Sequence, residues 1–267
     1  MAFAPQETLQ AQATRVGADS KRAHQRQREV ARRSVFLDNS QAVNRGYAIA
    51  VFARAPVAGR AKTRLIPLLG ARRAAKLQGA LLEDTLNKLH GLRGRLYLFL
   101  AGSAVPDHAI PRQFVLRQQQ GRELGERLDR AFHDLLKKHS GAVVIGTDSP
   151  SLGRQQLRLA LNELKTTEAV LGPCPDGGFY LIALRRRSSG LFDGVRWGSR
   201  FAFADMRQRL LQAGFSCSVL EGCADVDRPE DFRELAIALE RHPALRHRSP
   251  AVWRFCRTWL RGCRPAR

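Results

Sequence analysis

Short apolar runs and longer amphipathic segments alternate along residues 47–240. The apolar runs have the length of buried strands, and in the longer segments apolar residues recur every three or four positions, as on one face of a helix. The strands predicted in this way are 47–53, 96–101, 114–116, 142–146, 169–172, 179–184 and 217–220, and the helices are 71–89, 124–138, 154–165, 203–213 and 229–240. This alternation predicts a Rossmann-like α/β domain with three layers and a mostly parallel sheet, because a helix must return the chain between parallel strands.

The two ends of the chain differ from residues 46–240, which are predicted to form the single domain. Residues 1–45 are rich in Gln, Ala and Arg and poor in large apolar side chains, which predicts a basic, disordered extension. Residues 241–267 predict a basic amphipathic helix. Its apolar stripe holds Val252, Phe255, Cys256, Trp259 and Cys263, and its basic face holds Arg254, Arg257, Arg261 and Arg264. Packing of the aromatic stripe on the domain is favoured, and peripheral contact of the basic face with a membrane or RNA is left open.

Basic residues outnumber acidic ones by a wide margin. The 267 residues include 45 Lys and Arg against 24 Asp and Glu, a formal net charge of +21. More than half of this excess lies in the two ends, which together hold 16 basic and 4 acidic residues. The remaining excess suits a polyanionic substrate such as a nucleotide diphosphate, and a nucleic acid is not expected to be the main partner.

The composition also excludes several classes of protein. Apolar residues make up 44% and charged residues 26%, as in ordinary globular domains, which excludes a collagen-like or wholly disordered chain. No apolar run is long enough to span a bilayer. The five cysteines form no Cys-x-x-Cys pair and are expected to be free thiols, and the absence of a secretory signal predicts a cytoplasmic location.

Cations are crowded into the loop after the first predicted strand. Arg54, Gly59, Lys62 and Arg64 lie close together there, without either of the common glycine-rich phosphate motifs. In open parallel sheets ligands bind beyond the carboxyl ends of the strands. A glycine lets the backbone approach a ligand, and Lys or Arg neutralises phosphate oxygens, so this loop is a candidate phosphate site. A merely solvated basic loop is the alternative.

Acidic residues follow two other predicted strands. Asp148 comes directly after the apolar run 142–146, where it could hold Mg²⁺ or Mn²⁺ on a nucleotide, and its alternative is a turn or cap residue. Asp176 precedes Gly177 and Gly178 in a loop that either shapes a pocket or makes a hairpin turn.

Two further carboxylates precede the last predicted helix of the domain. Asp227 and Glu230 fit a capping box, with Pro229 in the first turn, so Asp227 is expected to cap the helix. Asp225 is left as the second metal contact or as an orienting group.

The order of these motifs resembles a family of bacterial glycosyltransferase-A-like proteins known as radical-SAM or selenodomain-associated transferases, some of them linked to arsenosugar biosynthesis. The resemblance covers residues 46–240, and its motifs are FARAPVAGRAKTRL, Gln120-Gly121 with LGER, GTDSPSL, GPCPDGGFYLIAL, Trp197 and DVDRPEDF. That family is similar to the 2-phospho-lactate and molybdenum-cofactor guanylyltransferases. Two departures concern Ser149, where the family often has Cys, and Gly198-Ser199-Arg200, where it tends to Ser-Thr.

The resemblance implies a nucleotide-diphospho-sugar transferase fold of the glycosyltransferase-A type, with a set of site residues. The nucleotide would be bound by Arg54, Gly59, Lys62, Arg64, Gln120, Gly121 and Gly125, the last three near the base. The acceptor would lie near Gly177, Gly178 and Trp197, the metal on Asp148 and Asp225, and the catalytic groups would be Asp148, Asp176 and Lys62.

Two reactions fit this predicted site. In glycosyl transfer, which is favoured, a metal on Asp148 bridges the diphosphate of a nucleotide sugar while an acceptor hydroxyl attacks the sugar carbon, with Asp176 as the candidate base. In nucleotidyl transfer, a phosphorylated acceptor attacks the α-phosphorus of a nucleoside triphosphate and expels pyrophosphate. Both reactions predict Mg²⁺ or Mn²⁺, a nucleotide and a small-molecule acceptor. A non-catalytic module that binds nucleic acid or a membrane surface is the third interpretation.

Overall fold

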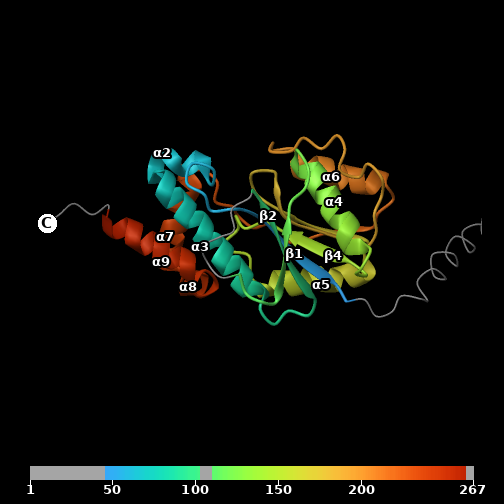
Figure 1. Cartoon of the computed structure of the whole chain (residues 1–267), viewed down its shortest axis with the longest axis horizontal. Helices are drawn as coiled ribbons and strands as arrows, with labels where there is room; N and C mark the ends of the chain where they lie inside the picture. The colour runs from blue at the N-terminus through green and yellow to red at the C-terminus, as the bar shows by residue number, and fades with distance from the viewer. Residues whose placement is uncertain (1–45, 103–109, 263–267) are drawn as a thin grey trace, which may run out of the picture. The chain divides into compact units, whose positions relative to one another are not determined.

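The structure, a computed structural model, describes residues 46–102 and 110–262 (Figure 1). The predicted extension, residues 1–45, lies outside the described residues. So do residues 263–267, the end of the predicted C-terminal helix.

A seven-stranded sheet forms the centre of the described part, with the strand order β3-β2-β1-β4-β6-β5-β7 (Figure 1). The strands are β1 (Ala48–Arg54), β2 (Arg95–Ala101), β3 (Phe114–Gln118), β4 (Ala142–Ile145), β5 (Ala169–Pro173), β6 (Phe179–Leu184) and β7 (Cys217–Val219). The helices are α2 (Ile66–Leu69), α3 (Ala71–Leu89), α4 (Leu124–Leu136), α5 (Arg154–Thr166), α6 (Ala202–Gln212), α7 (Pro229–Arg241), α8 (Pro243–Arg248) and α9 (Pro250–Gly262). Only β6 runs antiparallel to its neighbours, so the predicted mostly parallel sheet is confirmed.

Different helices cover the two faces of the sheet, because successive side chains of a strand point to opposite faces. Ile49 and Val51 of β1 belong to the apolar cluster that α3 and α5 complete. Ala48 and Ala50 belong to the cluster that α4 and α6 complete. Each of these helices packs the apolar stripe that its sequence periodicity predicts against the sheet. Helices therefore cover both faces of the sheet, which confirms the predicted three-layer α/β/α arrangement.

Within residues 46–240 the observed elements agree with the predicted ones within a few residues, apart from an addition in the first loop. The single helix predicted over 241–267 is divided, because α8 ends before Ser249 and α9 begins at Pro250. In the first loop a 3₁₀ helix, η1 (Thr63–Leu65), and α2 follow one another, although the sequence shows no helical period. These elements are too short to display a period, but their Leu65 and Leu69 are buried with α3 and α7. The first loop is therefore anchored to the core.

The chain between β5 and β6 forms a hairpin, one of the two alternatives that the sequence allowed. The two strands pair antiparallel, and within the turn the Cys174 N–H donates to Gly178 O at 2.9 Å. Asp176 Oδ1 accepts from the Gly178 N–H at 2.8 Å, as expected for an aspartate that shapes a tight turn.

The C-terminal helices α8 and α9 belong to the same compact unit as the sheet and lie beside α3 and α7 (Figure 1). The buried carboxylate of Asp84, on α3, accepts hydrogen bonds from the N–H groups of Ala251 and Val252 at 2.9 Å each, and so caps α9 from another helix. Burial raises the pKa of Asp84 and lowers the pKa of neighbouring Lys88 to about 8.

Two expectations from composition can be compared with the described residues. Their four cysteines are free thiols, as predicted, and Cys263 lies outside them. None of the helices in this part of the chain has both the length and the apolar character of a transmembrane span.

Candidate functional site

The strand order creates a crevice at the carboxyl ends of β1 and β4. These strands are neighbours in the sheet although two strands separate them along the chain, so the strand order reverses beside β1. Such a switch point in an open sheet leaves room for a ligand, because the flanking connections depart in opposite directions. A cavity of about 650 Å³ lies there, within the usual range for small-molecule sites.

A buried amine stands between two carboxylates at one wall of this cavity. Lys62 Nζ lies 2.7 Å from Asp148 Oδ1 and 3.8 Å from Asp227 Oδ1, and it donates to Val226 O at 2.6 Å. The Lys62 side chain is 3% exposed, whereas that of Asp148 is 46% exposed. Arg64 pairs with the other oxygen of Asp227. The first loop and the segment after β7 thus meet at the end of β4.

The backbone of Lys62 adopts an unusual conformation. Its φ of 47° is the only positive value for a non-glycine residue within 46–102 and 110–262. A left-handed backbone conformation is unfavourable in free energy for any residue that has a side chain. Such a conformation therefore persists only where surrounding contacts stabilise it. The contacts of the buried amine are of that kind.

Hydrogen bonds from α3 join the ends of β1 and β4. Gln78 Nε2 donates to Arg54 O at 3.3 Å and to Thr147 Oγ1 at 3.2 Å, and the Thr147 hydroxyl in turn donates to Asp148 Oδ1 at 3.2 Å. Gln78 and Thr147 are both buried. The Asp148 carboxylate is therefore oriented by its neighbours as well as by Lys62.

The loop after β4 is also held from its other side. Pro150 O accepts from the buried Lys88 amine and from the Ser249 hydroxyl, at 2.8 Å each, and the Val226 N–H donates to Asp148 O at 2.9 Å. The C-terminal helices thereby reach the backbone two residues beyond Asp148.

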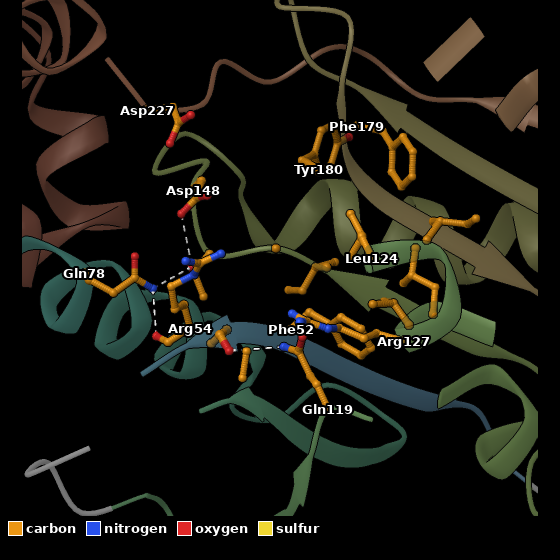
Figure 2. Close-up of a pocket in the computed structure, with 18 of the residues that line it drawn as sticks. Phe52, Arg54, Gln78, Gln119, Leu124, Arg127, Asp148, Phe179, Tyr180 and Asp227 are labelled. Atoms are coloured by element: carbon orange, nitrogen blue, oxygen red, sulfur yellow. Dashed lines mark hydrogen bonds between the residues drawn. The ribbon is translucent and has the colours of Figure 1, made fainter. Parts of the chain in front are cut away.

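The remaining walls of the cavity are lined by cations and by apolar side chains, and Arg127 lies on the same side as Phe52 and Leu124 (Figure 2). The cations that line it are Arg54, Lys62, Arg64, Arg122 and Arg127, and the apolar and aromatic side chains include Phe52, Leu124, Phe179 and Tyr180. Guanidinium and ammonium groups neutralise phosphate oxygens, and apolar or aromatic side chains pack against a base. This combination of cations and apolar side chains suits a nucleotide.

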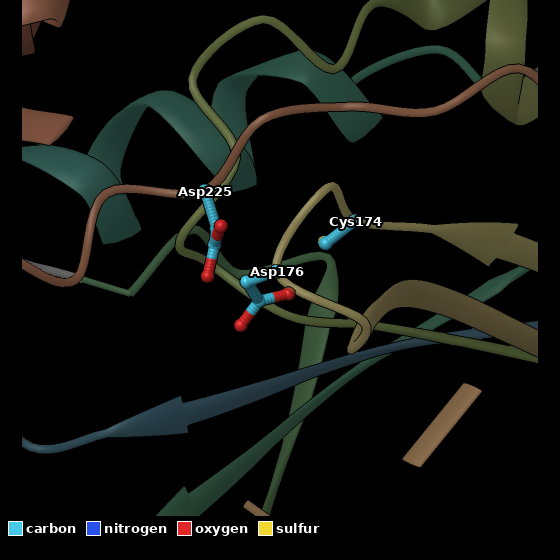
Figure 3. Close-up of side chains that lie close together, drawn as sticks. All are labelled: Cys174, Asp176 and Asp225. Carbon is cyan, nitrogen blue, oxygen red and sulfur yellow. The ribbon is translucent and has the colours of Figure 1, made fainter. Parts of the chain in front are cut away.

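A second cavity, of about 710 Å³, adjoins the first, and Arg64 and Asp227 line both. Asp176 and Asp225 also line it, and their carboxylates lie near Cys174, with ligand atoms of all three within 4.8 Å of one another (Figure 3). Burial and then the charge of Asp176 raise the pKa of Asp225 to about 6. Burial, Asp225 and Asp176 raise the pKa of Cys174 to about 12, so this thiol stays protonated at neutral pH.

The structure brings together only part of the predicted site. The predicted residues that line the first cavity are Arg54, Lys62, Arg64 and Asp148, and those that line the second are Asp176 and Asp225. The predicted residues that line neither are Gly59, Gln120, Gly121, Gly125, Gly177, Gly178 and Trp197.

Two of the predicted glycines are required by close packing. A Cβ at Gly125 would lie 2.6 Å from Trp197 Nε1, so the indole covers the first turn of α4. A Cβ at Gly177, whose φ is +87°, would lie 2.0 Å from Arg200 O. Both glycines thus permit close approaches that shape the surroundings of the cavities.

The prediction that Asp227 caps α7 with Glu230 was wrong. α7 begins at Pro229 with Arg228 as its cap residue, so the third helical position is Asp231, whose carboxylate accepts from the N–H groups of Asp227 and Arg228. The side chain of Asp227 faces Lys62 and Arg64 instead. The spacing by two from Asp225 was the one available signal for a second site residue here.

Sequence reasoning also missed two glutamines. Gln119 lines the first cavity, next to the predicted Gln120, and its amide nitrogen donates to Ala53 O at 3.1 Å and Phe99 O at 2.9 Å. Gln78 lies on the helical face counted as core. No local sequence pattern distinguishes either residue from an ordinary polar side chain.

The donor set of the first cavity fits a hard divalent cation. The point that Asp148 and Asp227 both approach, from different loops, is the Lys62 amine. Both carboxylates are partly exposed and line the cavity, and carboxylate oxygens are the ligands that Mg²⁺ and Mn²⁺ prefer. Asp225, the predicted partner of Asp148 on a metal, lines the neighbouring cavity.

Part of the chain is similar in sequence to known proteins. A family model described as "Uncharacterized protein conserved in bacteria (DUF2064)" matches residues 82–199. Over 125 residues the chain is 22% identical to 2-phospho-L-lactate guanylyltransferase of Methanobrevibacter smithii, a match that covers 46% of this chain and 56% of that protein. The chain thus spans little more than half the length of this relative. An association with radical-SAM or selenodomain proteins stays a prediction.

The similarity in fold extends further along the chain. A Desulfovibrio desulfuricans G20 protein with the provisional name nucleotide-diphospho-sugar transferase has a crystal structure that superimposes with a TM-score of 0.72 and 27% identity. The match covers 79% of this chain and 94% of that one. The described domain therefore has the fold of the nucleotide-diphospho-sugar transferases, and in sequence it is similar to the DUF2064 family and to a guanylyltransferase.

Proposed function

We propose that the protein is a metal-dependent glycosyltransferase that binds a nucleotide-diphosphate sugar in the cavity beside β1 and β4 and transfers the sugar to a small-molecule acceptor. The observation that carries this proposal is the buried amine of Lys62 between Asp148 and Asp227, at the wall of a cavity lined by further cations. A buried amine paired with partly exposed carboxylates at the switch point of a parallel sheet is typical of a binding site rather than of a stabilising core.

The cations assign an orientation to the nucleotide. Lys62 and Arg64 lie beside Asp227, where a diphosphate would neutralise their charge. Phe179 and Leu124 lie apart from Asp148 and Asp227, where a base would pack (Figure 2). The Gln119 amide, which donates hydrogen bonds to β1 and β2, also lines the cavity.

Asp148 and Asp227 are the residues that would hold Mg²⁺ or Mn²⁺ in this proposal. A bound divalent ion supplies positive charge to the diphosphate oxygens, on which negative charge accumulates as the leaving group departs. Lys62 holds the two carboxylates near each other, because its amine lies close to both.

The transfer step joins the acceptor to the sugar. The acceptor hydroxyl oxygen forms a bond to the anomeric carbon, the bond from that carbon to the diphosphate oxygen breaks, and the nucleoside diphosphate leaves with the electron pair. The hydroxyl proton passes to a carboxylate, for which Asp176 is our candidate because it lines the adjoining cavity and is exposed. The cations of the first cavity stabilise the departing diphosphate.

Nucleotidyl transfer is the second candidate function. The similarity to 2-phospho-L-lactate guanylyltransferase favours it. In that reaction an acceptor phosphate oxygen bonds to the α-phosphorus of a nucleoside triphosphate, the bond to the bridging oxygen breaks, and pyrophosphate leaves with the electron pair. An ionised acceptor needs no base, so the same cations would suffice.

Calorimetric titration with UDP, GDP, their sugar derivatives and the triphosphates, with and without Mn²⁺, tests the proposal. We expect Mn²⁺-dependent binding, and we expect Asp148→Ala to weaken it by roughly tenfold or more, since a charge-assisted contact is worth about 1.5–3 kcal/mol. Asp129→Ala is the matched control, because Asp129, on α4, is a similarly exposed aspartate that is paired with Arg187.

The outcomes separate the two reactions. Tighter binding of a sugar nucleotide than of any triphosphate supports glycosyl transfer, and the reverse order supports nucleotidyl transfer. An Asp148→Ala protein that binds nucleotide with unchanged affinity and unchanged response to Mn²⁺ contradicts the proposed role of Asp148.

A further inference from the structure

The second cavity lies where an acceptor would have to lie. It adjoins the first through two shared residues, Arg64 and Asp227, and Asp227 also approaches the Lys62 amine. A molecule in the second cavity is therefore next to the place proposed for the diphosphate. With about 710 Å³ it is large enough for a ligand of sugar size.

The two cavities have opposite charge. The first is lined by Arg54, Lys62, Arg64, Arg122 and Arg127 against Asp148, Asp227 and Glu123. The second is lined by Asp176, Asp225, Asp227, Asp231 and Glu234 against Arg64, Arg200 and Arg228. Cations are therefore in excess in the first cavity and carboxylates in the second.

Several charges of the second cavity are already engaged. Asp227 pairs with Arg64, and Asp231 accepts the backbone N–H groups at the start of α7. The guanidinium of Arg200 lies 4.9 Å from the centre of the Phe201 ring. No ion pair involves Asp176, Asp225 or Glu234 among the residues that the structure describes. Asp176 Oδ1 accepts the Gly178 N–H, so Asp176 Oδ2 and the carboxylates of Asp225 and Glu234 remain for a ligand.

Apolar side chains complete the wall. They include Pro150, Pro175, Val226, Leu235, Ala238 and Leu245, which come from the loops after β4, β5 and β7 and from helices α7 and α8. Carboxylates accept hydrogen bonds from hydroxyl and ammonium groups, whereas they repel phosphate at close range. The wall therefore combines hydrogen-bond acceptors with surface against which carbon atoms can pack.

We infer that the second cavity is the acceptor site and that it takes an unphosphorylated hydroxyl compound, either neutral or carrying an amine. This inference rests on the proposed function, because only a transferase needs a second ligand beside the nucleotide. It also favours glycosyl over nucleotidyl transfer, since carboxylates outnumber guanidinium groups on this wall and a phosphorylated acceptor would have to place its anion among them.

A titration of the isotope-labelled full chain followed by amide NMR tests the inference with three sugars of one skeleton: glucose, glucosamine and glucose 6-phosphate. The amides of Ser199 and Ala224 report on the second cavity, and those of Thr147 and Gln119 on the first. We expect glucosamine and glucose to shift the amide signals of Ser199 and Ala224. We expect their affinity to be at least tenfold higher than that of glucose 6-phosphate. We also expect the effect to persist with UDP and Mn²⁺ bound.

A double variant, Asp176→Asn with Asp225→Asn, sharpens the test. It removes two charges at nearly constant shape, so we expect the tenfold preference against glucose 6-phosphate at Ser199 and Ala224 to disappear. Glu230→Gln with Glu240→Gln removes the same charge from α7 outside the cavity and should leave the preference intact.

Three results overturn the inference: tighter binding of glucose 6-phosphate at the second cavity, no binding of any of the three sugars there, or displacement of the sugar by UDP. Failure of the proposed function appears separately, as an absence of UDP-dependent shifts at Thr147 and Gln119.

Discussion

The loops after β4 and β5 each present an aspartate near the two cavities, but they are held in different ways. The loop after β4 receives side-chain hydrogen bonds from Lys62, Lys88 and Ser249, which belong to three distant segments. The turn after β5 is closed mainly by bonds within residues 174–178. The difference indicates that the side proposed for the nucleotide is fixed in advance by distant segments, whereas the Asp176 side chain, on the side proposed for the acceptor, is held within its own turn.

Lys62→Met is the most direct test of the contacts that hold the loop after β4. It replaces a buried amine that approaches Asp148 and Asp227 by an apolar group of similar length. We expect the affinity for a nucleoside diphosphate to fall by roughly 30- to 100-fold, about 2–3 kcal/mol, and the affinity for the nucleoside to change far less. Calorimetry of the two ligands measures this difference.

The control for that change is Lys76→Met, an exposed lysine on α3. It should leave both affinities within twofold of the unmodified protein. Equal losses for nucleoside and diphosphate in Lys62→Met would show that Lys62 supports the cavity as a whole and does not contact phosphate.

Asp84→Ala tests whether the C-terminal helices support the fixed loop. It removes the acceptor of two backbone N–H groups at the start of α9, so we expect the free energy of unfolding to fall by about 2 kcal/mol. Urea unfolding followed by circular dichroism measures the loss. Asp84→Asn keeps one acceptor oxygen and should lose less than half as much, and equal losses in both variants would contradict capping as the cause.

Asp176→Ala should have the smallest effect on the fold. The side chain is exposed, and its hydrogen bond to the Gly178 N–H lies within the turn, so we expect unfolding free energy to change by less than about 0.5 kcal/mol. The same urea experiment checks this value. A loss of unfolding free energy above 1.5 kcal/mol would show that the Asp176 side chain stabilises more of the fold than its own turn.

Much of the fold could be predicted from the sequence, because the spacing of apolar residues follows the burial of their side chains. The apolar run 142–146 predicts a buried strand, and the apolar stripe over 71–89 predicts a helix with one buried face. The hairpin was left open, because Asp-Gly-Gly fits either a pocket or a turn until the strand pairing is known. The helices in the first loop escaped detection, since they make too few turns to show a period.

The candidate site was less accessible to sequence reasoning. Charged residues that follow strands, such as Lys62 and Asp148, could be placed at one edge of the sheet by topology alone. Asp227 could not, because a capping box and a site carboxylate look alike until the first helical residue is known. Lys88 and Asp84 look like ordinary polar positions of an amphipathic helix, and only the fold shows their partners, which are the loop after β4 for Lys88 and the start of α9 for Asp84.

The partnership between α3 and α9 has a consequence for synthesis of the protein. A ribosome releases Pro150 well before Ser249, which follows it by 99 positions, and Asp84 precedes the amide of Val252 by 168. Until α9 emerges, a nascent chain carries on α3 a carboxylate that has no backbone N–H groups of α9 to cap. Chains interrupted before α9 are therefore expected to be less stable than the full chain.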